Sequence, residues 1–268
     1  MGRGQRRRRQ RLQDGLGVVL LGCTLCLLLG GVGLGYAMRP PALDPETLCR
    51  RNAAPAAATL VLVETTDALA PRHRRRLRGV VEEEARRLPV GGRMLVLGVK
   101  PNAPRELKML FSRCNPGDGA AANPLFANTA KAQARWEEAF LTPLAAAAGR
   151  AAAGRKAAKA SPIVDAVRAA ALEPDFAAIK RSRRLVLVSD LLEHDPERGF
   201  SAYGEDVSLA HWSEADGGLE PPDLSGIAVR VVALDRADQA QRQIAVRDGL
   251  WTPWFDAANV AALEYEGL

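Results

Sequence analysis

Four stretches of the sequence are apolar almost without interruption, and they constrain the fold more than any other feature of the chain. They are residues 58–64, 91–100, 183–190 and 226–234, and each is rich in Val or Leu. A strand exposed on one face alternates apolar and polar residues, whereas a strand covered on both faces stays apolar. The four runs therefore predict buried strands of a mainly parallel sheet.

Helical patterns separate these strands. In 71–88 apolar residues recur every three or four positions, Pro71 can start a helix and Pro89 can stop it. Further elements are expected as a strand at 107–112, helices at 128–148 and 161–172, a long loop at 191–225, and one or two helices around Trp251, Trp254 and Phe255, whose rings are predicted to pack in the core. Pro143 is expected to kink its helix or end it early. The alternation predicts an α/β fold, a Rossmann-like three-layer sandwich.

The N-terminal part of the sequence predicts a membrane anchor. Residues 15–38 are 24 consecutive uncharged, mostly apolar residues, enough to cross a hydrocarbon core of roughly 30 Å. Six arginines and one acid, Asp14, precede them, so the positive-inside rule places the N-terminus in the cytoplasm. A cleaved signal peptide would have a shorter apolar core of about 7–15 residues. A lipid anchor at Cys23 would leave the following apolar residues unexplained.

These features predict a single-pass protein of the inner (cytoplasmic) membrane. Its expected parts are a basic cytoplasmic tail at 1–14, a transmembrane helix at 15–38, a Pro-rich linker at 39–55 and an α/β domain at 56–268 in the periplasm or an equivalent extracytoplasmic space. Cys49 and Cys114 are the only cysteines beyond the span. Because that space is oxidising, they are expected to form a disulfide.

The net charge of +6 does not indicate nucleic-acid binding. Most of it comes from the N-terminal arginines, and basic and acidic residues nearly balance from Arg39 onward. The arginine-rich stretch at 71–87 also carries glutamates. Opposite charges four residues apart favour a solvent-exposed helix, and the pairs predicted here are Arg78–Glu82, Glu82–Arg86 and Glu83–Arg87.

Three motifs, in order along the chain, resemble a von Willebrand factor A domain over roughly residues 56–262. A buried strand ends in an acid at Glu64 and a hydroxyl at Thr66, a helix opens with SPIVDAV at Ser161, and a later strand ends in VLVSD at Asp190. The sequence is similar, more narrowly, to bacterial single-span proteins that carry such a domain outside the membrane. The resemblance implies a three-layer α/β fold.

The resemblance also implies a degenerate metal-ion-dependent adhesion site. In this family an Asp-x-Ser-x-Ser motif, a loop Thr and a second Asp hold a divalent ion. The positions that match, including the variable position of Asp67, give a candidate Mg²⁺ site of Glu64, Thr66, Asp67, Ser161 and Asp190. Ala68 stands at the second Ser position and offers no ligand. The alternative is a vestigial, metal-free site in which Ser161 caps a helix and Asp190 braces a loop.

The expected function is that of an extracytoplasmic protein–protein interaction module whose sheet presents its carboxyl edge to a partner protein. The chain beyond the predicted span contains no G-x-S-x-G, Walker, H-E-x-x-H or G-x-G-x-x-G motif, which argues against an enzyme. Two alternatives remain open. One is a hydrolase using Asp67, Asp190, His194 or Asp195, and the other is a scaffold of a membrane complex that binds no ligand.

Overall fold

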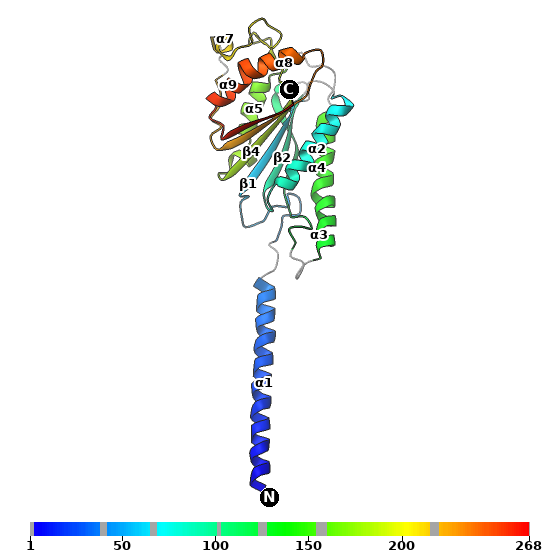
Figure 1. Cartoon of the computed structure of the whole chain (residues 1–268), viewed down its shortest axis with the longest axis vertical. Helices are drawn as coiled ribbons and strands as arrows, with labels where there is room; N and C mark the ends of the chain where they lie inside the picture. The colour runs from blue at the N-terminus through cyan, green and yellow to red at the C-terminus, as the bar shows by residue number, and fades with distance from the viewer. Residues whose placement is uncertain are drawn as a thin grey trace. The chain divides into compact units, whose positions relative to one another are not determined.

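The chain divides into two compact units, Met1–Ala42 and Leu43–Leu268. The computed structural model describes residues 3–37, 42–64, 69–100, 103–122, 128–153, 160–214 and 220–267. The first unit contains one long helix, α1 (Arg3–Ala37), drawn in blue in Figure 1. Among the residues that the structure describes, no helix combines the length and apolarity needed to cross a membrane.

The second unit is built on a six-stranded sheet in the order β3-β2-β1-β4-β7-β8 (Figure 1). β3 runs antiparallel to β2, and all other neighbours are parallel. The strands are β1 (Ala57–Val63), β2 (Arg93–Lys100), β3 (Ala103–Cys114), β4 (Ser182–Ser189), β7 (Ile227–Ala233) and β8 (Ala262–Glu266). This confirms the mainly parallel α/β sheet, and the order is that of doubly wound folds.

Helices cover both faces of the sheet, as Figure 1 shows. One face carries α2 (Pro71–Arg87) and α4 (Thr142–Ala152). The other carries α5 (Ile163–Ala171), α8 (Ala240–Val246) and α9 (Thr252–Ala257). A short helix, α6 (Pro174–Ala177), follows α5. The predicted three layers are therefore present.

β1 shows why its sequence is apolar throughout. Leu60 and Leu62 belong to the hydrophobic cluster on one face, and Val61 and Val63 belong to the cluster on the other. All four side chains are almost fully buried. Burying each of them stabilises the fold by about 1.5–3 kcal/mol, and a polar residue at these positions would lose that stabilisation. Trp251, Trp254 and Phe255 are also fully buried, which confirms their predicted place in the core.

Pro143 reshapes its helix without ending it. Helix α3 (Thr129–Trp136), a π-helical turn (Glu137–Leu141) and α4 follow one another directly. Proline has no N–H for the carbonyl four residues earlier, which here belongs to Ala139. Arg113 donates to that carbonyl at 2.6 Å instead. A second π turn (Arg247–Trp251) precedes Pro253 in the same way.

Several details differ from the expectations. The edge strand β8 was not predicted, because its residues are only partly buried and lack an apolar run. The loop expected at 191–225 contains a hairpin of β5 (His194–Asp195) and β6 (Phe200–Ser201) and a short helix, α7 (Leu209–Glu214). On α2 the Arg86–Glu82 and Arg87–Glu83 pairs form. The predicted Arg78–Glu82 pair is wrong, since Glu82 pairs toward the C-terminal side of the helix.

The predicted disulfide is confirmed: Cys49 is bonded to Cys114. Cys114 ends β3, and its backbone N–H also donates to the carbonyl of Thr47 at 2.7 Å. Cys23 and Cys26 of α1 are exposed thiols.

Candidate functional site

The candidate site lies where the carboxyl ends of β1, β4 and β7 meet. β1 pairs with β2 on one side and with β4 on the other. The strands that follow β1 are therefore added first on one side of it and then, from β4 onward, on the other side. Ligands of open α/β sheets bind beyond the carboxyl ends of the strands at such a point. Glu64 follows β1, Asp190 follows β4, and Arg236 lies three residues after β7.

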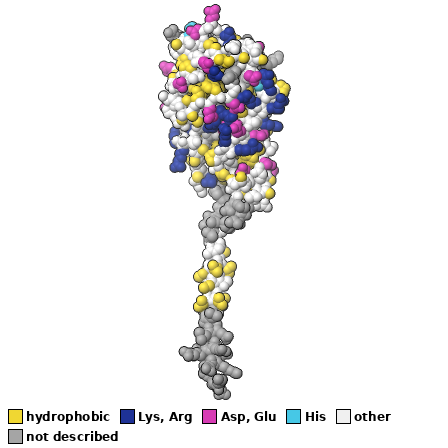
Figure 2. All heavy atoms as spheres, viewed as in Figure 1, with side chains coloured by type: hydrophobic (Ala, Val, Ile, Leu, Met, Phe, Trp, Pro, Cys, Tyr) yellow, Lys and Arg dark blue, Asp and Glu magenta, His cyan; other side chains and the backbone are white. Residues whose placement is uncertain are grey.

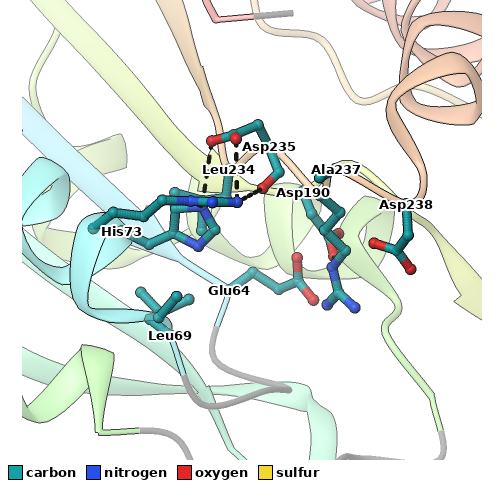
Figure 3. Close-up of a pocket in the computed structure, with 11 residues that line it drawn as sticks. Glu64, Leu69, His73, Asp190, Leu234, Asp235, Ala237 and Asp238 are labelled. Carbon is teal, nitrogen blue, oxygen red and sulfur yellow. Dashed lines mark hydrogen bonds and ion pairs between the residues drawn. The ribbon is translucent and has the colours of Figure 1, made fainter.

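A hollow of about 550 Å³ opens at this edge. Figure 3 shows Glu64, His73, Asp190 and Asp235 around it. Its lining is mainly polar and charged, and the full set is Glu64, Leu69, Ala70, Arg72, His73, Asp190, Leu234, Asp235, Arg236, Ala237 and Asp238.

Glu64 is held by two serine hydroxyls. Ser161 Oγ donates to one carboxylate oxygen at 2.5 Å, and Ser189 Oγ donates to the other at 2.6 Å. The Glu64 side chain is buried, so it relies on these donors in place of water. Ser161 therefore does meet Glu64, as the resemblance implied. Thr66 and Asp67 lie outside the described residues.

Asp190 is buried against an arginine. Its Oδ2 lies 2.5 Å from Arg236 Nε, and its Oδ1 accepts a hydrogen bond from the backbone N–H of Leu192 at 3.0 Å. The second contact is the loop brace that the alternative hypothesis predicted. The rule that selected Glu64 and Asp190 as strand-end residues also applies to the strand at 226–234. Applied there, it would have drawn attention to Arg236.

The backbone after β4 makes an unusual turn at Leu191, which has a positive φ of 64° and is fully buried. A leucine in this conformation costs roughly 1–2 kcal/mol. Two buried contacts hold it: its N–H donates to Ser189 Oγ at 2.8 Å, and its carbonyl accepts from Trp251 Nε1 at 2.9 Å. The turn directs Asp190 toward the hollow, and no local sequence signal indicates it.

Glu193 caps α5 in the role that the sequence suggested for Ser161. The helix begins at Ile163, its cap residue Pro162 offers no side-chain hydrogen bond, and Ser161 donates to Glu64 instead. Glu193 Oε2 accepts the backbone N–H of Val164 at 2.9 Å. The N-cap hypothesis for Ser161 was therefore wrong, because a carboxylate from a distant loop takes the helix N–H groups.

Replacing Glu193 by Gln is expected to remove a pH-dependent loss of stability. Burial raises the pKa of the Glu193 carboxyl well above its usual value of about 4.5, and the charges of Asp165 and Glu64 act in the same direction. The folded protein keeps a proton that the unfolded chain releases, so this group's stabilisation is complete below the unfolded pKa and falls as the pH rises toward the folded pKa. Gln is never charged and still accepts the Val164 N–H.

Urea unfolding of the wild type and of Glu193→Gln between pH 4.5 and 8 measures this effect. The free energy of unfolding of the variant should rise relative to the wild type as the pH increases. The exposed Glu205, changed to Gln, is the control and should follow the wild type. Parallel pH profiles for Glu193→Gln and the wild type would contradict the expectation.

One wall of the hollow is a group of charged residues paired with one another. Arg72 lies 3.2 Å from Asp235 Oδ2, and His73 Nε2 lies 3.3 Å from Asp235 Oδ1. Arg72 also donates to the Asp235 carbonyl at 2.9 Å. The first turn of α2 is thereby fastened to the end of β7.

The described residues of the predicted ion site do not fit Mg²⁺. The ion requires a near-octahedral oxygen shell at about 2.0–2.1 Å. Both Glu64 oxygens accept serine hydroxyls, and Asp190 carries the guanidinium of Arg236. Within the described part of the chain, no group of three or more His, Cys, Asp or Glu side chains is arranged to hold a metal ion.

Each of the residues considered for hydrolysis that the structure describes contacts a partner outside that set. His194 Nδ1 lies 3.2 Å from Ser201 Oγ, and its ring contacts Tyr203. Asp195 is almost fully buried and lies 3.8 Å from Arg198. Asp190 faces the hollow and pairs with Arg236.

Comparisons with known proteins give matches among solved structures at low sequence identity. No protein-family model and no curated protein matches the sequence. Among solved structures, the SpRpn10 VWA domain is similar with a TM-score of 0.38 and 11% identity, over 79% of this chain and 88% of that one. Human COPII-coat protein Sec24c has a TM-score of 0.38 and 11% identity, over 81% of this chain and 30% of that one.

A third similar structure is an aerotolerance-related membrane protein from Bacteroides fragilis NCTC 9343, solved with multiple mutations to serine. It has a TM-score of 0.32 and 12% identity, over 79% of this chain and 92% of that one. At such scores and identities, none of the three defines a family or a function for this chain.

Proposed function

We propose that the chain is a membrane-anchored, extracytoplasmic module that binds a partner protein at the carboxyl edge of its sheet, without acting as an enzyme. The observation that carries the proposal is the hollow between the ends of β1, β4 and β7. Its position is that of ligand sites in doubly wound folds. Its lining combines buried carboxylates with exposed charged side chains at the rim, which can hydrogen-bond a polar surface of a partner.

The rigidity of this edge also supports a binding role. Glu64, Asp190 and Asp235 are each held by side-chain partners from other elements. Groups fixed before association lose little conformational entropy when a partner docks. A site built for hydrolysis would instead need a nucleophile and a base aimed at one point.

Site-specific photo-crosslinking in whole cells tests the binding role. A crosslinking residue at Ala237, exposed on the rim of the hollow, should give one discrete heterologous adduct. The same residue at Arg181, exposed just before the start of β4 at the opposite edge, is the matched control and should give none. Equal labelling at both positions, or none at Ala237, would contradict the proposal.

Membrane attachment is supported by the sequence of residues 15–38 and by the surface of α1. Figure 2 shows apolar side chains on the described part of this helix. The described large apolar side chains that are exposed on it are Val19, Leu20, Leu21, Leu25, Leu27, Leu28, Leu29, Val32 and Tyr36. A helix that exposes apolar residues around its circumference needs an apolar environment.

Introducing charge into α1 tests the anchor. Leu25→Arg together with Leu28→Arg adds an insertion cost of about 2.5–3.5 kcal/mol per arginine, so alkaline carbonate should release this variant from membranes and leave the wild type in the pellet. Thr24→Ala is the control and should stay membrane-bound. A reporter enzyme fused after Leu268 should be active outside the cytoplasm. Release of the wild type, or activity only inside the cell, would contradict the anchor or the orientation.

A further inference from the structure

We infer that Arg236 takes the place of a divalent cation at the carboxyl edge of the sheet, so that the site works without metal. The inference concerns the charge balance of the site and does not depend on whether the hollow binds a protein. It rests on the contacts of Asp190, the position of Arg236 and a buried glutamine that fixes them both.

The Asp190 carboxylate is neutralised by Arg236, a residue that also lines the hollow. The Asp190 side chain is 7% exposed and that of Arg236 is 35% exposed, with Nε and Oδ2 2.5 Å apart. Both residues line the hollow. The guanidinium is thus the more exposed of the two partners, and it lines the hollow from which an ion would approach. A charge-assisted contact of this kind is stronger than a neutral hydrogen bond.

Gln243 of α8 fixes the two partners relative to one another. Its side chain is fully buried. Its Nε2 donates to the carbonyls of Asp190 at 2.8 Å and Leu234 at 3.0 Å, and its Oε1 accepts the backbone N–H of Arg236 at 2.9 Å. One amide thus joins the end of β4 to the end of β7. The arginine is held at its backbone and at its side chain.

The second carboxylate of the site is satisfied in a different way. Glu64 accepts hydroxyl hydrogen bonds from Ser161 and Ser189, and an ion bound there would have to displace them. Guanidinium–carboxylate pairs have N–O distances of about 2.7–2.9 Å, whereas Mg²⁺ requires oxygen at about 2.0–2.1 Å. A Mg²⁺ ion bound to Oδ2 of Asp190 would therefore have to displace the Arg236 guanidinium.

The first measurement uses the wild-type full-length chain. We expect the same melting temperature in MgCl₂ or MnCl₂ as in EDTA at equal ionic strength, and no bound Mn²⁺ in its electron paramagnetic resonance spectrum. Mn²⁺ that binds to the wild type and is lost on Asp190→Asn would overturn the inference.

The second measurement removes the arginine. Arg236→Ala leaves the Asp190 carboxylate without this cation and should gain a Mn²⁺ site, seen as bound Mn²⁺ by resonance and as a rise in melting temperature of about 3–6 °C at tenfold the dissociation constant. If Arg236→Ala does not fold, the same two measurements are made on Arg236→Gln, which also lacks the positive charge.

Two controls isolate the effect. Arg72→Ala removes another arginine of the same hollow, one paired with the more exposed Asp235, and should gain no Mn²⁺. The double variant Arg236→Ala/Asp190→Asn should bind no Mn²⁺ and should show no rise in melting temperature with Mn²⁺. Absence of any Mn²⁺ gain in folded Arg236→Ala or Arg236→Gln would overturn the inference, as would an equal gain in Arg72→Ala.

Discussion

Replacing Cys49 and Cys114 together by Ser is expected to lower the free energy of unfolding by about 4 kcal/mol. The disulfide joins residues 65 positions apart, and in the chain-entropy model a closed loop of this length restricts the unfolded chain to about that extent. The bond also holds the segment around Thr47 against the end of β3. For a domain of this size the loss corresponds to a decrease in melting temperature of about 10 °C.

Thermal unfolding of the wild type, with and without a reducing agent, measures the effect directly. Reduction should shift the wild type toward the double variant and leave the variant unchanged. Replacing the exposed Cys23 and Cys26 by Ser is the matched control and should not alter the transition of the α/β unit. A loss below about 1 kcal/mol in the double variant would show that this bond does not restrict the unfolded chain as expected.

Replacing Arg230 by Ala should cost about 3 kcal/mol of stability. Arg230 is buried on β7, and its guanidinium lies 2.7 Å from Glu84, 2.9 Å from Glu83 and 2.5 Å from Glu266. Glu84 is fully buried on α2, so losing the arginine removes its shortest ion pair. Breaking a buried pair from one side is costly, because a charge with too little compensation stays in the interior.

Urea unfolding measures this loss, and two further variants identify its cause. Arg86→Ala breaks only the exposed pair with Glu82 and should change stability by less than about 0.5 kcal/mol. The double variant Arg230→Met/Glu84→Leu removes both charges and should recover much of the loss. If the double variant is as unstable as Arg230→Ala, the cost comes from packing and not from the uncompensated carboxylate.

Parts of the fold followed from local patterns in the sequence. The apolar runs at β1 and β4 predicted strands covered on both faces, since every side chain of such a strand must enter one of two cores. Elements whose stability depends on distant partners were not predicted. β8 has little apolar signal of its own and pairs with β7 along the edge of the sheet. The π turn before Pro143 depends on Arg113, which comes from β3.

In the candidate site, too, some residues could be predicted from local sequence patterns and others could not. Glu64, Ser161 and Asp190 were found from their places at strand ends and at a helix start. Their partners were not, because a buried polar group can be satisfied by any donor that the fold brings near it. Figure 3 shows how residues far apart in the sequence surround one hollow.

The sequence by itself determined a mainly parallel, doubly covered sheet, the disulfide and the edge at which polar strand ends meet. These depend on periodicity, composition and cysteine number, which are local or countable properties. Only the tertiary structure decided that Asp190 faces Arg236, that Glu193 caps α5 and that Gln243 joins two strand ends. The physical reason is that a buried charge or amide takes its role from the groups that folding places within about 3 Å of it, and sequence separation does not encode that distance.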